Sequence, residues 1–135
     1  MNKNHNPFQF ISEDGKTVFS LIQKRGPATK NELQKYTKIK LSTLNRIMQP
    51  LEEIGLIVNS GIGDSTGGRR PMLYSATDKK YYIVGIDISR TYTQILITNL
   101  KMNILGKRQF TMTENHTPEV TVKLIGESTR TILCE

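Results

Sequence analysis

Apolar residues recur every three or four positions through the first 55 residues, the spacing of one helical face, and they predict three helices. The first helix is expected from about residue 12 to residue 24, with Ser12 in its cap. Gly26-Pro27 should end it, because proline cannot continue the hydrogen-bond ladder. The apolar stripe of this helix consists of Val18, Leu21 and Ile22.

A short second helix is predicted directly after Thr29. Thr29 followed by Glu32 is the pattern of a capping box, in which each side chain bonds the backbone N–H of the other residue. Leu33 and Tyr36 are expected to point inward from this helix. Residues 37–40 should then form a turn that leads into the next helix.

The third helix has the most regular pattern in the chain. Its apolar stripe consists of Leu44, Ile47, Met48, Leu51 and Ile54. Its opposite face is polar and carries Ser42, Thr43, Asn45, Arg46 and Gln49. Pro50 removes one backbone donor and predicts a kink or an early change of direction, and Gly55 is the expected residue just past the helix end.

Two short β-like runs follow the third helix, at residues 56–60 and 72–75. Between them, residues 61–68 have the composition of a loop, which leads into Arg69-Arg70-Pro71. Three helices followed by a two-stranded hairpin make a winged helix-turn-helix. We therefore predict a DNA-binding domain of this type at residues 1–78.

The way such motifs dock on DNA assigns roles to these residues. The N-terminal part of the third helix enters the major groove, where polar side chains meet base edges. Gly67 and Gly68 let the hairpin loop approach the DNA, so that the next two arginines reach the minor groove. The predicted base contacts are Ser42, Thr43, Asn45, Arg46, Gln49, Arg69 and Arg70. The predicted phosphate contacts are Thr29, Lys38 and Lys40.

The distribution of charge adds to this prediction. The 135-residue chain holds 19 basic and 12 acidic residues, a formal net charge of +7. Residues 1–80 hold 13 basic and 7 acidic residues, net +6, whereas residues 81–135 are net +1. A basic half joined to a nearly neutral half indicates two modules, of which the first faces a polyanion. A solvated lysine surface is the alternative explanation of the excess.

Composition argues against several other classes of protein. No apolar run approaches the roughly 18 residues of a membrane span, and residues 1–7 lack the apolar core of a secretory signal. We expect a cytoplasmic protein with no membrane partner. Cys134 is the single cysteine, so no internal disulfide is expected. His5 and His116 lie far apart, so neither a metal site nor a cofactor is predicted.

The second half of the chain has the pattern of three strands and a helix. Residues 82–88, 92–99 and 104–111 are the predicted strands, with Ile95 and Ile97 on one face of the middle strand. Pro118 begins the predicted helix, whose apolar residues are Val120, Leu124, Ile125 and Ile132.

Three stretches resemble the ROK family of transcription regulators (repressors, open reading frames, kinases). GIGDSTGGRRP at residues 61–71 is similar to the wing of that family, and GPATKNEL at residues 26–33 is similar to its first interhelical stretch. YIVGIDISRT at residues 82–91 is similar to the opening strand and first phosphate loop of its sugar-kinase-like domain. The resemblance covers roughly residues 12–133 and is to the N-terminal portion of xylose-repressor-like members.

This resemblance implies an α+β chain, in which the winged helix-turn-helix precedes the first β-meander and helix of an actin-like, ribonuclease-H-like domain. That second domain, residues 79–135, is expected to be incomplete. The resemblance further implies a repressor of sugar-utilisation genes. Its expected partner is a pseudo-palindromic, double-stranded DNA operator bound by a homodimer, because two half-sites multiply affinity and specificity. A sugar or sugar-phosphate effector is implied only where the remainder of the sensor domain is present.

The phosphate loop departs from the pattern of the kinase members. Ser89-Arg90 stand where glycines are expected, so Asp87, Ser89, Arg90 and Thr91 are at most a vestigial phosphate loop. No later catalytic segment follows, and no enzyme activity is expected. A fragment of a sugar kinase, and a winged helix that contacts protein instead of DNA, are the alternative functions.

Overall fold

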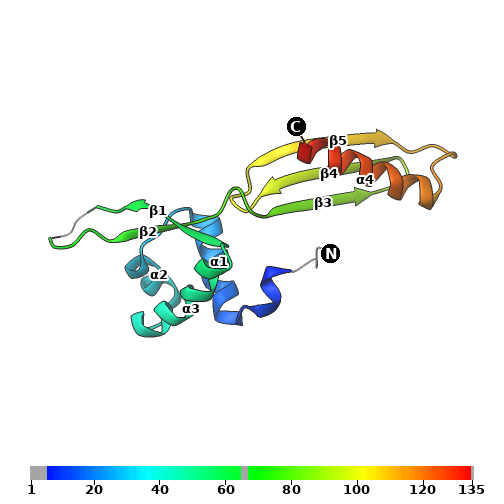
Figure 1. The fold of residues 1–135 in the computed structure, drawn as a ribbon. Helices are drawn as coiled ribbons and strands as arrows, with labels where there is room; N and C mark the ends of the chain where they lie inside the picture. Colours follow the sequence, from blue (N-terminus) through cyan, green and yellow to red (C-terminus); the bar gives the residue numbers. More distant parts are fainter. Residues whose placement is uncertain (1–5, 65–66, 135) are drawn as a thin grey trace. The chain divides into compact units, whose positions relative to one another are not determined.

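The fold divides into two compact units, the first ending at Lys80 and the second beginning at Tyr81. The structure, a computed structural model, describes residues 6–64 and 67–134 (Figure 1). Helices precede a hairpin in the first unit, and an antiparallel sheet precedes a helix in the second. The fold is therefore of the mixed α+β kind that the sequence predicts.

Three helices and a two-stranded hairpin make up the first unit, after a short 3-10 helix, η1 (Pro7–Phe10). The helices are α1 (Glu13–Arg25), α2 (Lys30–Thr37) and α3 (Leu41–Glu53), and the strands are β1 (Ile57–Ile62) and β2 (Met72–Ala76). These bounds follow the sequence pattern closely, because apolar stripes, caps and turn residues are local signals.

Side chains fix where α1 and α2 begin. The Ser12 hydroxyl accepts a hydrogen bond from the backbone N–H of Gly15 at 3.1 Å and caps α1. At α2 the capping box is complete: the Thr29 N–H donates to the Glu32 carboxylate at 2.7 Å, and the Glu32 N–H donates to the Thr29 hydroxyl at 3.2 Å. Both caps satisfy backbone donors that a helix start otherwise leaves unpaired, and the predicted capping box is confirmed.

Gly55 fixes where α3 ends. Its φ of +75° allows the Leu56 N–H to donate to the Leu51 carbonyl at 2.9 Å and the Gly55 N–H to donate to the Glu52 carbonyl at 3.0 Å. This pair of bonds is a Schellman motif, so the predicted role of Gly55 is confirmed. The helix continues for three residues past Pro50, which removes only one donor from the ladder.

The core of the first unit lies between the three helices and β1. It contains the fully buried side chains of Val18, Ile22, Leu33, Leu44, Met48, Leu51, Leu56 and Ile57. The predicted inward position of Tyr36 is wrong, because the residue is 53% exposed. The Arg25 guanidinium lies 3.7 Å from the centroid of its ring, a cation–π contact that keeps the phenol at the edge of the core.

The hairpin is antiparallel and carries one bulge. Asn59 pairs with Tyr74 and Gly61 pairs with Leu73, so one residue of β1, Ser60, is skipped in the backbone pairing register. The bulge lets the ladder continue to Ile62, whereas the sequence predicted a loop from Gly61 onward. Ser65 and Thr66, in the middle of the predicted loop, lie outside the described residues.

A backbone bridge ties this hairpin to the helices. The Ala28 N–H donates to the Tyr74 carbonyl, and the Tyr74 N–H donates to the Ala28 carbonyl, each at 2.9 Å. Ala28 immediately precedes the cap of α2, so β2 is fastened to the point where α2 begins.

In the second unit, three strands form a sheet that α4 covers in part. The elements are β3 (Tyr82–Ile88), β4 (Tyr92–Asn99), β5 (Ile104–Thr111) and α4 (Pro118–Cys134), and the sheet order is β3-β4-β5. α4 packs on β4 and β5, and its Ile132 forms a core with Ile95 and Ile97 (Figure 1). Gly106 pairs with Ile97, and a side chain at Gly106 would collide with Ile132.

Among the described residues, no helix has the length and hydropathy that a bilayer crossing requires. In the same ranges, no group of three or more His, Cys, Asp or Glu side chains could hold a metal ion.

Replacing Thr29 tests the capping box. Thr29→Ala should lower the free energy of unfolding by about 1 kcal/mol, because the Glu32 N–H loses its acceptor. Thr29→Ser keeps the hydroxyl and should retain most of the stability. Urea denaturation followed by circular dichroism measures both, and equal destabilisation by the two variants would contradict the capping role.

Candidate nucleic-acid interface

The core fixes which face of α3 is accessible, and the residues on that outer face are polar. Leu44, Met48 and Leu51 are fully buried and orient the helix. Away from them, the side chains of Ser42, Asn45, Arg46 and Gln49 are exposed and that of Thr43 is half-buried. Four of the five predicted base-contact residues on this helix are therefore accessible, and the fifth is partly so.

Two hollows border the polar face of α3. Asn45 lines a hollow toward α2 and β2. Thr43 and Arg46 line another hollow, of about 310 Å³, beside Phe10 and Ile11 at the start of the chain. Ser42, Asn45, Arg46 and Gln49 are spaced three or four residues apart on α3, the spacing of one helical face, and Asn45 and Arg46 each also line one of the two hollows.

The two ends of α3 differ in charge. Gln49 points toward the C-terminal end, where its amide donates to the Glu53 carboxylate at 2.9 Å. At the other end the helix starts without a side-chain cap, so its first-turn N–H groups lack the side-chain acceptor that α1 and α2 have. Lys38, in the left-handed conformation at φ 61°, and Lys40, the N-cap residue, are both exposed beside this start. The N-terminal end is thus the electropositive one.

Thr29, a predicted phosphate contact, is only 9% exposed. Its hydroxyl accepts from the Glu32 N–H and lies 3.1 Å from the Glu32 carboxylate, to which it donates. The geometry therefore gives this side chain a role in positioning the start of α2.

The two arginines of the hairpin loop lie on the surface. Arg69 and Arg70 are exposed and follow Gly67 and Gly68, whose φ values of +88° and +139° suit glycine. A Cβ atom at either glycine would touch nothing, so backbone conformation and not lack of space calls for glycine there. The Gly63 N–H donates to the Pro71 carbonyl at 2.8 Å and closes the base of the loop.

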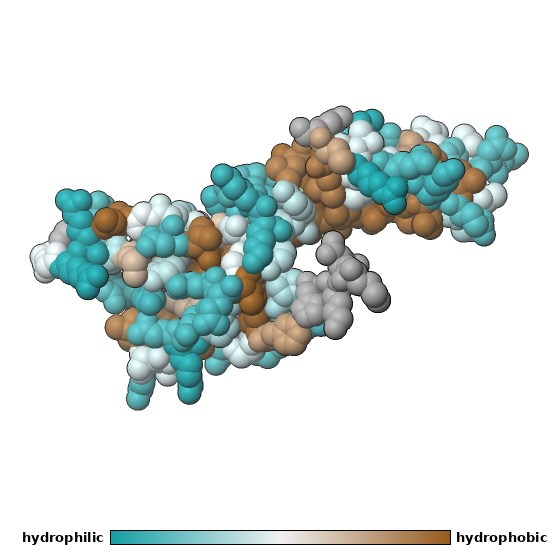
Figure 2. Space-filling model, viewed as in Figure 1, coloured by the Kyte–Doolittle hydropathy of each residue, from teal (hydrophilic) through white to brown (hydrophobic). Residues whose placement is uncertain are grey.

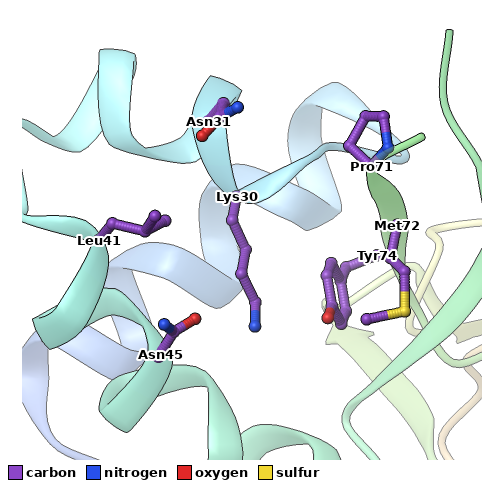
Figure 3. A pocket seen from close by; sticks show the side chains of 7 residues that line it. All are labelled: Lys30, Asn31, Leu41, Asn45, Pro71, Met72 and Tyr74. Atoms are coloured by element: carbon purple, nitrogen blue, oxygen red, sulfur yellow. The ribbon is translucent and has the colours of Figure 1, made fainter. Parts of the chain in front are cut away.

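A hollow of about 190 Å³ lies where α2, α3 and β2 meet (Figure 3). The Lys30 side chain extends from the start of α2 into the space between Asn45 and Tyr74, and its ammonium lies 5.3 Å from the centroid of the Tyr74 ring. The complete lining consists of Lys30, Asn31, Leu41, Asn45, Pro71, Met72 and Tyr74.

Of these residues, only Asn45 was a predicted contact. The signal for Lys30 was its place as the first residue of a helix that begins beside the third helix. Leu41 continues the apolar stripe of Leu44 by three positions, so the pattern alone suggests a core residue, yet it is 41% exposed.

In the second unit, the predicted vestigial phosphate loop is a tight turn between β3 and β4. The Ser89 hydroxyl donates to the Tyr92 carbonyl at 2.8 Å and accepts from the N–H groups of Tyr92, at 3.0 Å, and Thr91, at 3.3 Å. These amides are therefore already bonded within the turn, while Arg90 and Thr91 are exposed.

Asp87 also has a partner within this hairpin. The Tyr92 hydroxyl donates to the Asp87 carboxylate at 3.1 Å. This hydrogen bond and the negative charge of Asp87 raise the pKa of Tyr92 above its ordinary value, because both disfavour the phenolate.

The sequence of the chain is similar to those of known transcription regulators. No protein-family model matches the chain. Over 110 residues, 82% of the chain, it is 29% identical to the xylose repressor of Bacillus subtilis (strain 168). Over 97 residues, 72% of the chain, it is 24% identical to the DNA-binding transcriptional dual regulator NagC of Escherichia coli (strain K12).

The fold has a counterpart among solved structures. The crystal structure of a ROK family transcriptional regulator, a homolog of the E. coli MLC protein, superposes with a TM-score of 0.61 at 19% identity. The match covers 90% of this chain and 31% of that one. Likewise, the chain aligns with 28% of the length of the Bacillus subtilis xylose repressor. Together, these similarities in sequence and fold confirm the predicted resemblance to xylose-repressor-like regulators of the ROK family.

Proposed function

We propose that the chain acts as the DNA-binding part of a transcriptional repressor. In this proposal residues 1–78 are a winged helix-turn-helix, and residues 79–135 are the first part of an actin-like domain of the ROK type. The observation that carries the proposal is the exposed polar face of α3, whose uncapped N-terminal end lies beside two exposed lysines. The names of the relatives, xylose repressor and DNA-binding transcriptional regulator, support the same function.

In the proposed complex, α3 enters the major groove with its N-terminal end. Ser42, Asn45 and Arg46 then face base edges, and Thr43 lies at the side of the helix. Lys38 and Lys40 contact phosphates, which fixes the register of the helix. Gln49 completes the contact after its amide leaves Glu53, since that bond is on the exposed surface and exchanges readily with water.

The β1–β2 loop is proposed to act as the wing. Arg69 and Arg70 enter the minor groove, where narrow A·T tracts have the most negative potential. The positive φ values of Gly67 and Gly68 support this role, because they give the backbone a tight course that projects the next side chains outward.

Sugar sensing is proposed only where the remainder of the sensor domain accompanies these two units. Relatives named for xylose and N-acetylglucosamine support a role in sugar utilisation. The effector would be a sugar or sugar phosphate, bound by segments of the relatives with which this chain does not align. Kinase activity is disfavoured, since Ser89 occupies the amides that a phosphate would need. Because its proposed partner is DNA, the protein is proposed to act in the cytoplasm.

Selection of bound genomic fragments tests the proposal and returns the operator. We expect one recurring, pseudo-palindromic sequence, whose affinity falls steeply as the salt concentration rises, because bound phosphates release counterions. A salt-independent affinity, or recovery of random fragments, would count against DNA recognition. Retention of a protein partner in the presence of excess DNA would instead support the protein-contact alternative.

Charge variants separate base contacts from phosphate contacts. Arg46→Ala and Arg69→Ala should each weaken binding of the selected operator by about 1–3 kcal/mol and relax its sequence preference. Lys38→Ala should weaken all DNA about equally and reduce the salt slope by about one. Lys123→Ala removes an exposed charge from the second unit and serves as the control. Fluorescence anisotropy at several salt concentrations measures all four variants, and equal effects of Arg46→Ala and Lys123→Ala would refute the assignment.

We further propose that this chain forms a homodimer through β3. Within the described residues β3 pairs only with β4, and every residue of β3 is exposed. Hydrophobic surface gathers on the second unit around this strand (Figure 2), and Ile83, Val84, Ile86 and Ile88 contribute to it. An apolar strand edge of this kind favours pairing with another strand.

Light scattering tests the dimer. The chain should have the mass of a dimer at concentrations of tens of micromolar, and Ile86→Lys should shift it toward a monomer by placing charge in the contact. Val58→Lys changes an exposed apolar residue of the first unit and should leave the mass unchanged. A strict monomer at high concentration would contradict the dimer.

A further inference from the structure

We propose that the hollow between α2, α3 and β2 receives the 5-methyl group of a thymine in the operator. The inference rests on the proposed function, because it requires α3 to lie in the major groove. It assigns a ligand group to Leu41 and Met72, and it predicts which base the protein prefers at one position of each half-site.

The walls of the hollow are apolar although the surface around them is polar. Leu41 is 41% exposed and Met72 is 48% exposed, and they belong to different elements, α3 and β2. Pro71 and the ring of the buried Tyr74 complete the apolar lining (Figure 3). Exposed apolar side chains that converge on one hollow gain free energy when an apolar group displaces the water between them.

Two polar side chains that share the hollow, those of Asn45 and Lys30, indicate what kind of molecule carries that apolar group. Asn45 shares the hollow with Leu41, four residues earlier on the same face of α3. An asparagine amide at this position suits the N6 and N7 atoms of adenine. The Lys30 ammonium, held near the Tyr74 ring, provides a positive charge for the DNA backbone.

Thymine is the base that combines these features in the major groove. It presents a 5-methyl group there, whereas cytosine has only a hydrogen on C5 and would leave the space between Leu41 and Met72 unfilled. The geometry therefore favours an adenine at Asn45 with a thymine methyl at a neighbouring base pair. The same hollow disfavours a cytosine at that position, even though no side chain bonds it.

Deoxyuridine substitution tests the proposal without changing the protein. In the operator recovered by selection, each thymine of a half-site is replaced in turn by deoxyuridine, which removes only the methyl group. Binding of the full chain should weaken about fourfold per half-site at one position, the factor expected for one buried methyl group. The remaining positions should be unaffected.

Substitutions in the hollow, combined with the deoxyuridine operators, form a double-mutant cycle. Leu41→Ala should bind the thymine operator about fourfold more weakly, and it should no longer distinguish thymine from deoxyuridine at that position. Val58→Ala truncates an exposed apolar residue outside the hollow and should keep the full difference. Circular dichroism confirms that each variant is folded.

Two results would overturn the inference while leaving the proposed function intact. In the first, the protein binds its selected operator specifically but tolerates deoxyuridine at every position. In the second, Leu41→Ala retains the same preference for thymine as the unmodified chain. If selection yields no preferred sequence at all, both the inference and the proposed function are wrong, so the two failures are distinguishable.

Discussion

The backbone bridge between Ala28 and Tyr74 is the contact on which the arrangement of the first unit depends. Its two hydrogen bonds, each 2.9 Å long, join the turn before α2 to the middle of β2. Thr29 follows at once and caps α2, and Lys30 then lies near the ring of Tyr74. The bridge therefore fixes where the hairpin lies against the start of α2, which the capping box sets, and where the hollow between them forms.

α3 has a buried apolar face and an exposed polar face, and helical spacing separates the residues of the two faces. The buried face of Leu44, Met48 and Leu51 fixes the rotation of the helix, so the accessible face follows without further contacts. Its acidic residues, Glu52 and Glu53, lie at the C-terminal end, away from the lysines that precede the helix. Repulsion from DNA phosphates is thereby kept at a distance from the end proposed to enter the groove.

Local signals in the sequence are enough to predict most of the fold. They do not predict contacts between segments that are distant in the sequence. The capping box of Thr29 and the end of α3 at Gly55 depend on residues within five positions of each other, and both predictions are confirmed. The contact of Tyr36 with Arg25 joins two different helices, and the hollow depends on β2 approaching Lys30 from more than 40 residues away. Periodicity within one segment contains no information on such approaches, so the hollow is not predicted from the sequence.

The hairpin loop and the hollow share one stretch of backbone at the start of β2. Pro71 and Met72 lie directly after the two exposed arginines, so the segment proposed to reach the minor groove continues into a wall of the hollow proposed to meet the major groove. A change in the loop would then alter both grooves together, because the loop and the wall share a short stretch of backbone closed by the Gly63–Pro71 hydrogen bond. Preference for A·T pairs at Arg69 and for thymine at Leu41 would consequently be coupled, and double substitutions at the two sites should deviate from additivity.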